Sequence, residues 1–140
     1  CPRRPEGAGV ELLYAFARGA LEDARRKVLV VDDDEGVRSI LERVLVRRGY
    51  DVVAAADARE ALSAVTTHPF DLAIVDVVLG HADGREVARA LAAARAGLRI
   101  LHVSGDAAAG SAADGAAAFL AKPFTPAELV AAVDRALAPA

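Results

Sequence analysis

The stretch KVLVVDDDEGVRSIL, residues 27–41, decides the fold, because a run of four apolar residues ends directly in three aspartates. The apolar run 28–31 predicts a short buried strand, and the pattern after Asp34 predicts an amphipathic helix over residues 35–48. Aspartate is a preferred residue immediately before a helix, so we expect Asp34 to be the N-cap. Like charges at the end of a buried strand repel one another, which indicates that a cation lies beside them.

The same alternation of apolar runs and helical patterns continues to the end of the chain. Five strands are predicted at residues 28–31, 52–55, 72–75, 100–103 and 118–120. Helices are predicted at residues 35–48, 58–67, 84–95 and 126–138, whereas the glycine-containing fourth connection, 105–116, predicts a short or frayed helix. Continuous apolar strands between helices indicate an α/β fold with a doubly wound five-stranded parallel sheet. The expected strand order is 2-1-3-4-5.

Residues 1–26 differ from the rest and are predicted to be a leader, with the main domain in residues 27–140. Residues 1–9 are rich in Pro, Gly and Arg, and residues 10–26 have the spacing of an extra amphipathic N-terminal helix. This helix is interpreted as a linker or the end of an upstream domain, with a dimerisation or docking helix as the alternative. The chain is expected to be a stand-alone unit, an intermediate in a relay or a piece of a larger kinase or regulator, and the start at Cys1 and the short fourth connection favour the last.

Composition excludes several classes of protein. Residues 1–27 hold six Lys and Arg against four Asp and Glu, and residues 28–140 hold eleven against sixteen, so the main domain carries the acidity. A net charge of −3 argues against a general nucleic-acid binder. The single cysteine excludes an intrachain disulfide. No apolar run reaches the roughly 18 residues that cross a bilayer. A cytoplasmic protein without membrane contact is therefore expected.

Polar side chains follow four of the five predicted strands. Asp32 and Asp33 follow the first, Asp76 the third, Ser104 the fourth and Lys122 the fifth. In open parallel sheets, ligands bind beyond the carboxyl ends of the strands, so these groups are expected on one rim.

Clustered carboxylates suit Mg²⁺, which takes one or two carboxylates, waters and a phosphate oxygen. Lys122 and Ser104 indicate that an anion also binds. An aspartate can attack phosphorus and hold an acyl phosphate, and Asp76, at the middle strand, is the candidate nucleophile.

Four motifs together resemble the receiver domain of two-component response regulators: VLVVDDDEGVRSILERVL at 28–45, LAIVDVVLGHADG at 72–84, ILHVSGD at 100–106 and FLAKPFTPAEL at 119–129. The resemblance covers residues 27–138 and implies a flavodoxin-like fold.

The resemblance also implies roles for individual residues. It implies that Asp32 and Asp33 hold Mg²⁺ with Asp76 and the carbonyl of Val78. It implies that Asp76 accepts phosphate from a histidine kinase or a histidine phosphotransfer protein, and that Ser104 and Lys122 bind the phosphoryl oxygens. Phe119 would move with Ser104 as the switch that changes a protein-interaction surface. Lys122 would precede Pro123 through a cis bond.

The chain departs from the family pattern at several positions. Phe119 lacks the hydroxyl of the tyrosine often found there, Gly80 stands where proline is usual, and apolar Val78 replaces a frequent polar residue, so dephosphorylation is expected to differ from the average member. The connection between Ser104 and Lys122 is short, as in the C-terminal receivers of hybrid sensor kinases.

Two other functions fit part of the pattern. In haloacid-dehalogenase-type phosphatases a strand ends in Asp-x-Asp, which Asp32 and Asp34 would supply, although Glu35-Gly36 replaces the usual Gly-Thr. A receiver that takes no phosphate and serves only as an interaction module is the third possibility. The three histidines, at positions 68, 81 and 102, have no ligand-like spacing, and His102 is expected to pack within its strand.

Overall fold

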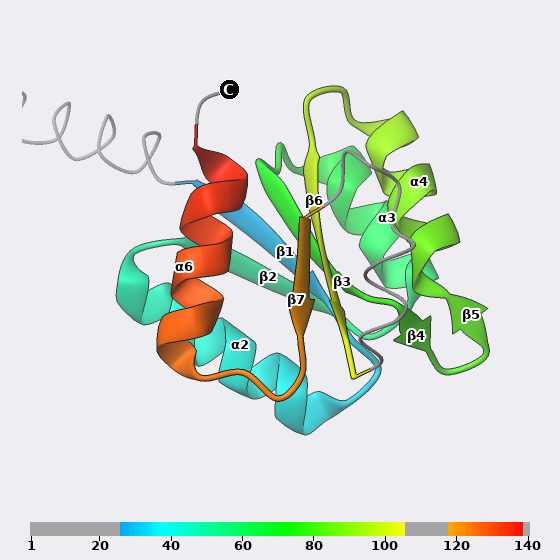
Figure 1. Cartoon of the computed structure of the whole chain (residues 1–140). Helices are drawn as coiled ribbons and strands as arrows, with labels where there is room; N and C mark the ends of the chain where they lie inside the picture. The colour runs from blue at the N-terminus through cyan, green and yellow to red at the C-terminus, as the bar shows by residue number, and fades with distance from the viewer. Residues whose placement is uncertain (1–25, 106–117, 139–140) are drawn as a thin grey trace, which may run out of the picture.

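The computed structural model of the chain describes residues 26–105 and 118–138. The predicted leader helix and nearly all of the fourth connection lie outside these residues. The described elements, shown in Figure 1, are β1 (Lys27–Val31), α2 (Glu35–Arg48), β2 (Asp51–Ala55), α3 (Ala58–Thr67), β3 (Leu72–Asp76), β4 (Val78–Leu79), β5 (Ala82–Asp83), α4 (Gly84–Ala94), β6 (Arg99–Ser104), β7 (Ala118–Ala121) and α6 (Pro126–Leu137).

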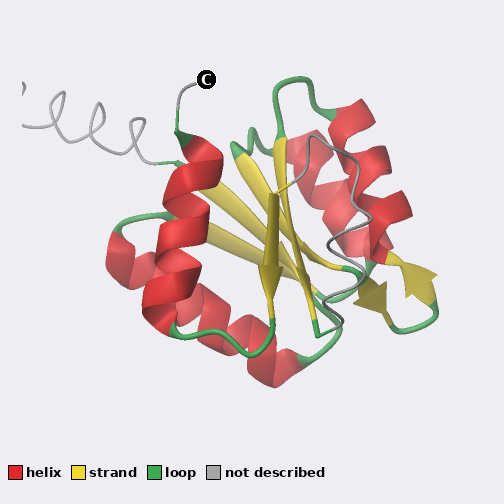
Figure 2. Cartoon of the chain, in the orientation of Figure 1, coloured by secondary structure: helices red, strands yellow, loops and turns green. Residues whose placement is uncertain are grey.

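The main sheet has five parallel strands in the order β2-β1-β3-β6-β7. Since β6 and β7 are the fourth and fifth predicted strands, the predicted order 2-1-3-4-5 is confirmed. Helices α2 and α6 cover one face of the sheet and α3 and α4 cover the other, as Figure 2 shows. The doubly wound α/β prediction is therefore confirmed.

Burial on both faces explains why the strands are apolar without alternation. Leu29 and Val31 of β1 belong to the core under α3 and α4, whereas Val28 and Val30 belong to the core under α2 and α6. All four side chains are at most 1% exposed. A strand buried on both faces needs an apolar residue at every position, which is the pattern of residues 28–31.

Helix caps fix where the chain leaves the rim of the sheet. As predicted, Asp34 caps α2, because its side chain accepts hydrogen bonds from the N–H groups of Gly36 and Val37. Asp83 caps α4 in the same way, and Thr125 forms a reciprocal capping box with Glu128 at the start of α6.

One feature of the fold was not predicted from the sequence. Strands β4 and β5 pair as a small antiparallel hairpin directly after Asp76, with Val78 opposite Asp83. Two-residue strands are too short to show a periodic pattern, so residues 78–83 carried no strand signal. The hairpin places Val78 beside the end of β3.

Across residues 26–105 and 118–138, the helices lack the length and apolar character required to cross a membrane.

Candidate functional site

The carboxyl ends of β1, β3, β6 and β7 surround a pocket of about 530 Å³. The structure brings all five predicted polar residues to this pocket: Asp32, Asp33, Asp76, Ser104 and Lys122. Val78 and Gly80, from the hairpin that follows β3, also line it. Side chains from four separate strands thus meet at one rim, as the topology of a parallel sheet requires.

Three carboxylates form a group that suits a hard divalent cation. Asp32, Asp33 and Asp76 each have a carboxylate oxygen that lies within 4.8 Å of an oxygen of the other two. Asp32 and Asp76 are 2% and 8% exposed, whereas Asp33 is exposed. Two buried carboxylates and one solvent-facing carboxylate provide oxygen ligands while leaving room for waters. The donor set therefore fits Mg²⁺.

Lys122 is a basic residue that forms ion pairs with two of these carboxylates. Its Nζ donates to Asp76 Oδ2 at 2.8 Å and lies 3.4 Å from Asp32 Oδ2. Burial on its own would lower the pKa of Lys122, but the hydrogen bond to Asp76 and the charge of Asp32 outweigh it and raise that pKa. Burial raises the pKa of Asp32, while the Asp34 N–H and the Lys122 charge act against the increase.

Backbone groups hold the two buried carboxylates in place. Asp32 Oδ1 accepts the N–H of Asp34 at 2.9 Å, and Asp76 Oδ1 accepts the N–H of Val78 at 3.0 Å. Asp76 is therefore oriented by one backbone donor and one ammonium donor. An aspartate held in this way has a defined direction for attack on a bound electrophile.

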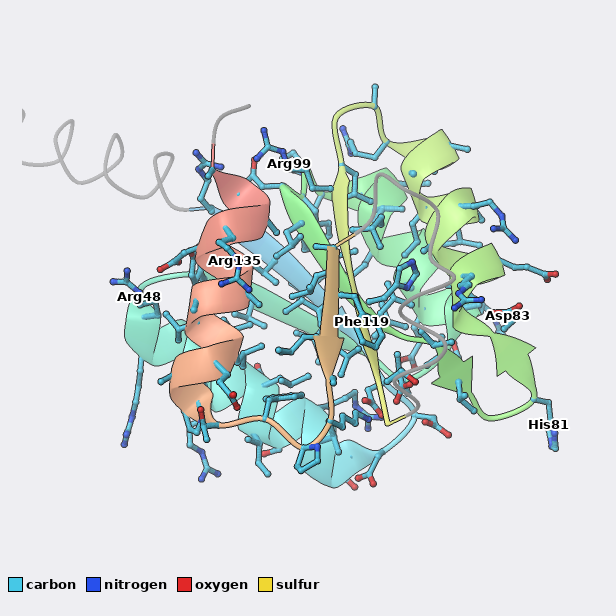
Figure 3. All side chains as sticks on the ribbon, viewed as in Figure 1. Arg48, His81, Asp83, Arg99, Phe119 and Arg135 are labelled. Carbon is cyan, nitrogen blue, oxygen red and sulfur yellow. The ribbon has the colours of Figure 1, made fainter. Side chains whose placement is uncertain are left out.

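Ser104 and Phe119 lie on the two strands that follow β3 in the sheet. Ser104, at the end of β6, is 2% exposed, and its carbonyl accepts the N–H of Lys122 at 2.8 Å. Phe119 lies on β7 beside His102 in the sheet register (Figure 3). The Lys122–Pro123 peptide bond is cis, the geometry that the resemblance implies. His102 is buried, as expected for a histidine within a strand.

Sequence reasoning missed two residues that contact the site. The Arg38 side chain, on α2, donates from Nη1 to the carbonyl oxygen of Asp32 at 2.7 Å. Gly84, at the start of α4, lies so close to β3 that a Cβ on it would be 1.8 Å from the carbonyl oxygen of Asp76. Neither residue is a ligand position in the four sequence motifs. No periodicity in the sequence indicates the Arg38 contact, and only the Asp83-Gly84 pair at the start of a predicted helix could have drawn attention to Gly84.

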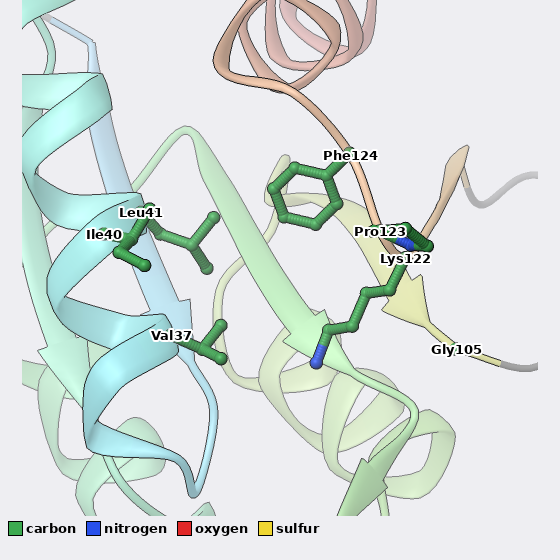
Figure 4. A pocket seen from close by; sticks show the side chains of 7 residues that line it. All are labelled: Val37, Ile40, Leu41, Gly105, Lys122, Pro123 and Phe124. Atoms are coloured by element: carbon green, nitrogen blue, oxygen red, sulfur yellow. The ribbon is translucent and has the colours of Figure 1, made fainter.

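An apolar groove adjoins the acidic pocket. It has a volume of about 520 Å³ and lies between α2 and the segment that leads from β7 to α6, as Figure 4 shows. Its lining residues are Val37, Ile40, Leu41, Gly105, Lys122, Pro123 and Phe124. Ile40 is 56% exposed, although it is a large aliphatic side chain. Lys122 and Gly105 line both hollows, so the groove and the acidic pocket are contiguous.

Known proteins share both the sequence and the fold. The family model described as the response regulator receiver domain matches residues 28–134. The alkaline phosphatase synthesis transcriptional regulatory protein PhoP of Bacillus subtilis is 38% identical over 113 residues, which are 77% of this chain and 47% of that protein. The chain thus spans about half the length of this relative.

Solved structures agree with the sequence comparison. The response regulator TrrA of Thermotoga maritima, solved in complex with Mg(2+)-BeF, has a TM-score of 0.72 at 28% identity, covering 80% of this chain and 99% of that one. The receiver domain of the hybrid histidine kinase CckA has a TM-score of 0.70 at 30% identity, with coverages of 80% and 99%. Similarity extends to receivers from different architectures, so the resemblance to hybrid kinases stays a prediction. The chain belongs to the family of response regulator receiver domains.

Proposed function

We propose that this domain is a phosphoacceptor in two-component signalling and that Asp76 is the residue that takes the phosphoryl group. The donor is the phosphohistidine of a histidine kinase or a histidine phosphotransfer protein. An Asp76 carboxylate oxygen bonds to phosphorus while the bond between phosphorus and the imidazole nitrogen breaks. The observation that carries the proposal is the close approach of three carboxylate oxygens, within 4.8 Å, beside the Lys122 ammonium.

Asp32, Asp33 and Asp76 would hold Mg²⁺, with the carbonyl of Val78 completing the protein ligands. The metal would neutralise charge on the phosphoryl oxygens, which is the main catalytic demand of phosphoryl transfer. Lys122, already 2.8 Å from Asp76, and the Ser104 hydroxyl would bind the remaining oxygens. The relative solved with Mg(2+)-BeF supports this interpretation of the donor set.

Phosphorylation would change the surface through Ser104, Phe119 and Lys122. A phosphoryl group carries a charge of about −1.5 to −2 in place of the single negative charge of the Asp76 carboxylate, and the additional charge attracts the ammonium and the hydroxyl. Reversing a two-state population from 1:99 to 99:1 takes about 5.5 kcal/mol of discrimination. One ion pair and one hydrogen bond reach that value only when water is excluded. The 2% exposure of Ser104 provides such an environment.

The apolar groove is the proposed docking place of the phosphodonor. A donor must bring its phosphohistidine to Asp76, and the groove shares Lys122 and Gly105 with the acidic pocket. Exposed Ile40 and the apolar lining provide area that a donor helix could cover without disturbing the carboxylates. Docking there would place the donor beside the reacting group.

The proposed organisation is a leader, residues 1–26, followed by the receiver, residues 27–140, in a cytoplasmic signalling protein. The leader would connect the receiver to another domain or to a second copy of the chain, and the receiver itself would contact proteins and not nucleic acid. Gel filtration of chains with and without residues 1–26 tests whether the leader forms a dimer. If both chains eluted at the volume expected for a monomer of their mass, the leader would not be a dimerisation segment.

The deciding experiment is labelling with acetyl phosphate in the presence of Mg²⁺, followed by intact-mass and peptide mass spectrometry. Wild-type protein should gain one phosphoryl group on Asp76, and Asp76→Asn should gain none. Incorporation at another residue in Asp76→Asn would defeat the assignment.

Labelling, beryllofluoride binding and a phosphatase assay together separate the two alternatives. A wild-type chain that takes neither acetyl phosphate nor beryllofluoride would be a pure interaction module. Turnover of a phosphate monoester that is lost in Asp32→Asn but kept in Asp76→Asn would indicate the phosphatase. Asp34 already caps α2, which makes it a poor second carboxylate for that chemistry.

A further inference from the structure

The turn from Asp32 to Asp34 is fixed at each polar group of Asp32. The Asp32 N–H donates to the carbonyl of Ala55 at 3.2 Å, and Asp32 Oδ1 accepts the N–H of Asp34 at 2.9 Å. Asp32 Oδ2 lies 3.4 Å from Lys122 Nζ, and the Asp32 carbonyl accepts Nη1 of Arg38 at 2.7 Å. The Arg38 contact reaches back over the N-terminus of α2 from a half-buried side chain.

The Asp32 carbonyl belongs to the peptide unit that joins Asp32 to Asp33. Peptide units are planar, so holding the oxygen also sets the direction in which the chain enters Asp33. Asp33 is exposed, and packing therefore does little to orient it. Its carboxylate nevertheless has an oxygen that lies within 4.8 Å of oxygens of Asp32 and Asp76, close enough for the three to share a cation.

We propose that Arg38 is a positioning residue for the cation site: by holding the carbonyl of Asp32, it keeps Asp33 directed towards Asp32 and Asp76 before the ion arrives. This inference rests on the proposed metal role of the three aspartates. Arg38 contacts neither the ion nor the phosphoryl group in this role. It acts through the peptide unit that precedes Asp33.

Electrostatics alone predicts the opposite effect of this residue. A guanidinium near a cation site repels the ion, so removing the charge should tighten Mg²⁺ binding. Loss of a positioning contact should weaken binding, because the carboxylates must then be ordered as the ion binds. The two explanations therefore predict changes of opposite sign for Arg38→Met.

The test is Mg²⁺ titration by calorimetry, without any phosphoryl group, on the full chain. Arg38→Met should bind Mg²⁺ about 10-fold more weakly, the lower end of the effect of groups that orient metal ligands. Arg38→Lys keeps the charge and one shorter donor, so its affinity should lie between those of Arg38→Met and the wild type. Exposed Arg43, on the same helix, provides a control: Arg43→Met removes the same charge and should change the affinity less than twofold.

Two further measurements distinguish a failure of the proposed metal site from a failure of the positioning role of Arg38. Asp33→Asn should weaken Mg²⁺ binding strongly; wild-type affinity in that variant would overturn the proposed metal site itself. In metal-free NMR spectra, Arg38→Met should shift the amide resonances of Asp33 and Asp34, whereas Arg43→Met should leave them in place. Equal or tighter Mg²⁺ binding by Arg38→Met, with Asp33→Asn still impaired, would overturn the positioning role alone.

Discussion

Replacing Gly84 with alanine should strongly slow the proposed phosphorylation of Asp76, although Gly84 does not line the acidic pocket. Gly84 begins α4, and its N–H donates to the carbonyl of Val77 at 2.6 Å, so the helix starts in direct contact with the chain that follows Asp76. A Cβ at residue 84 would lie 1.8 Å from the carbonyl oxygen of Asp76 and 2.8 Å from Val77 Cα. These neighbours are backbone atoms, which cannot rotate away as a side chain can.

The size of the displacement follows from these distances. Ordinary van der Waals contact begins near 3.4 Å, so the Asp76 carbonyl and the new methyl group must separate by about 1.6 Å. Overpacking of this kind typically costs about 1–3 kcal/mol of folding free energy. A shift of about 1 Å in a reacting group can reduce a rate about 100-fold. We therefore expect Gly84→Ala to fold with reduced stability and to take phosphate from acetyl phosphate about 100-fold more slowly.

The assay is the rate of acetyl phosphate labelling by intact-mass spectrometry, combined with urea unfolding. Gly97→Ala is the matched control. Gly97 has φ +85°, and among the described residues no heavy atom lies within 4 Å of the position that its Cβ would take, so the variant adds backbone strain without crowding. It should lose stability through that strain but label at the wild-type rate. If Gly84→Ala labelled as fast as Gly97→Ala, the close approach of α4 to β3 would not control the phosphoacceptor.

Three further predictions concern Lys122, Ile40 and Tyr50. Lys122→Ala should bind Mg²⁺ at least as tightly as the wild type, because the ammonium competes with the ion for the carboxylates. When beryllofluoride is added to this variant, the changes in NMR chemical shift should no longer spread to β7 and α6. Chemical shift changes like those of the wild type would contradict this. Ile40→Asp should slow phosphoryl transfer from a kinase domain by about 10-fold or more, when that kinase domain also labels the wild type. Labelling by acetyl phosphate should stay unchanged, since the side chain is exposed and its loss changes stability by about 0.5 kcal/mol or less. An equal effect on both donors would exclude docking in the groove. Burial and the hydrogen bond to Asp134 raise the pKa of Tyr50 to about 12, above the ordinary value of 10, so stability present below pH 10 should be lost between pH 10 and 12. Tyr50→Phe should remove that part of the alkaline loss in urea unfolding, and an unaltered pH profile would show that Tyr50 is not its source.

The strands and the rim were predictable because their causes are local in the sequence. A strand buried on both faces must be apolar throughout, and residues 28–31 and 72–75 satisfy that condition completely. Once the strands are known, parallel topology requires that the residues after them meet at one edge. Asp32, Asp76 and Lys122 could therefore be brought together without knowing a single distance.

Contacts that depend on the reach of one side chain or the close approach of two backbones could not be predicted in this way. Arg38 holds the Asp32 carbonyl from six residues further along, a distance that no helical or strand periodicity indicates. The approach of Gly84 to Asp76 depends on the angle at which α4 leaves the β4–β5 hairpin, and that hairpin has no periodic signal. The groove combines α2, Gly105 and residues 122–124, so its shape exists only after folding.

In the proposed function, Lys122 would connect the chemistry of Asp76 to the surface that a donor would contact. Without a phosphoryl group its ammonium lies 2.8 Å from Asp76 and its stem lines the apolar groove. A phosphoryl group on Asp76 would carry more charge than the carboxylate it replaces, so Lys122 would follow the new oxygens and the groove would change with it. A donor docked beside Ile40 would then meet a different surface after transfer than before it. Release of the donor and the new output surface would thus follow from one movement of Lys122, because this side chain belongs to both hollows.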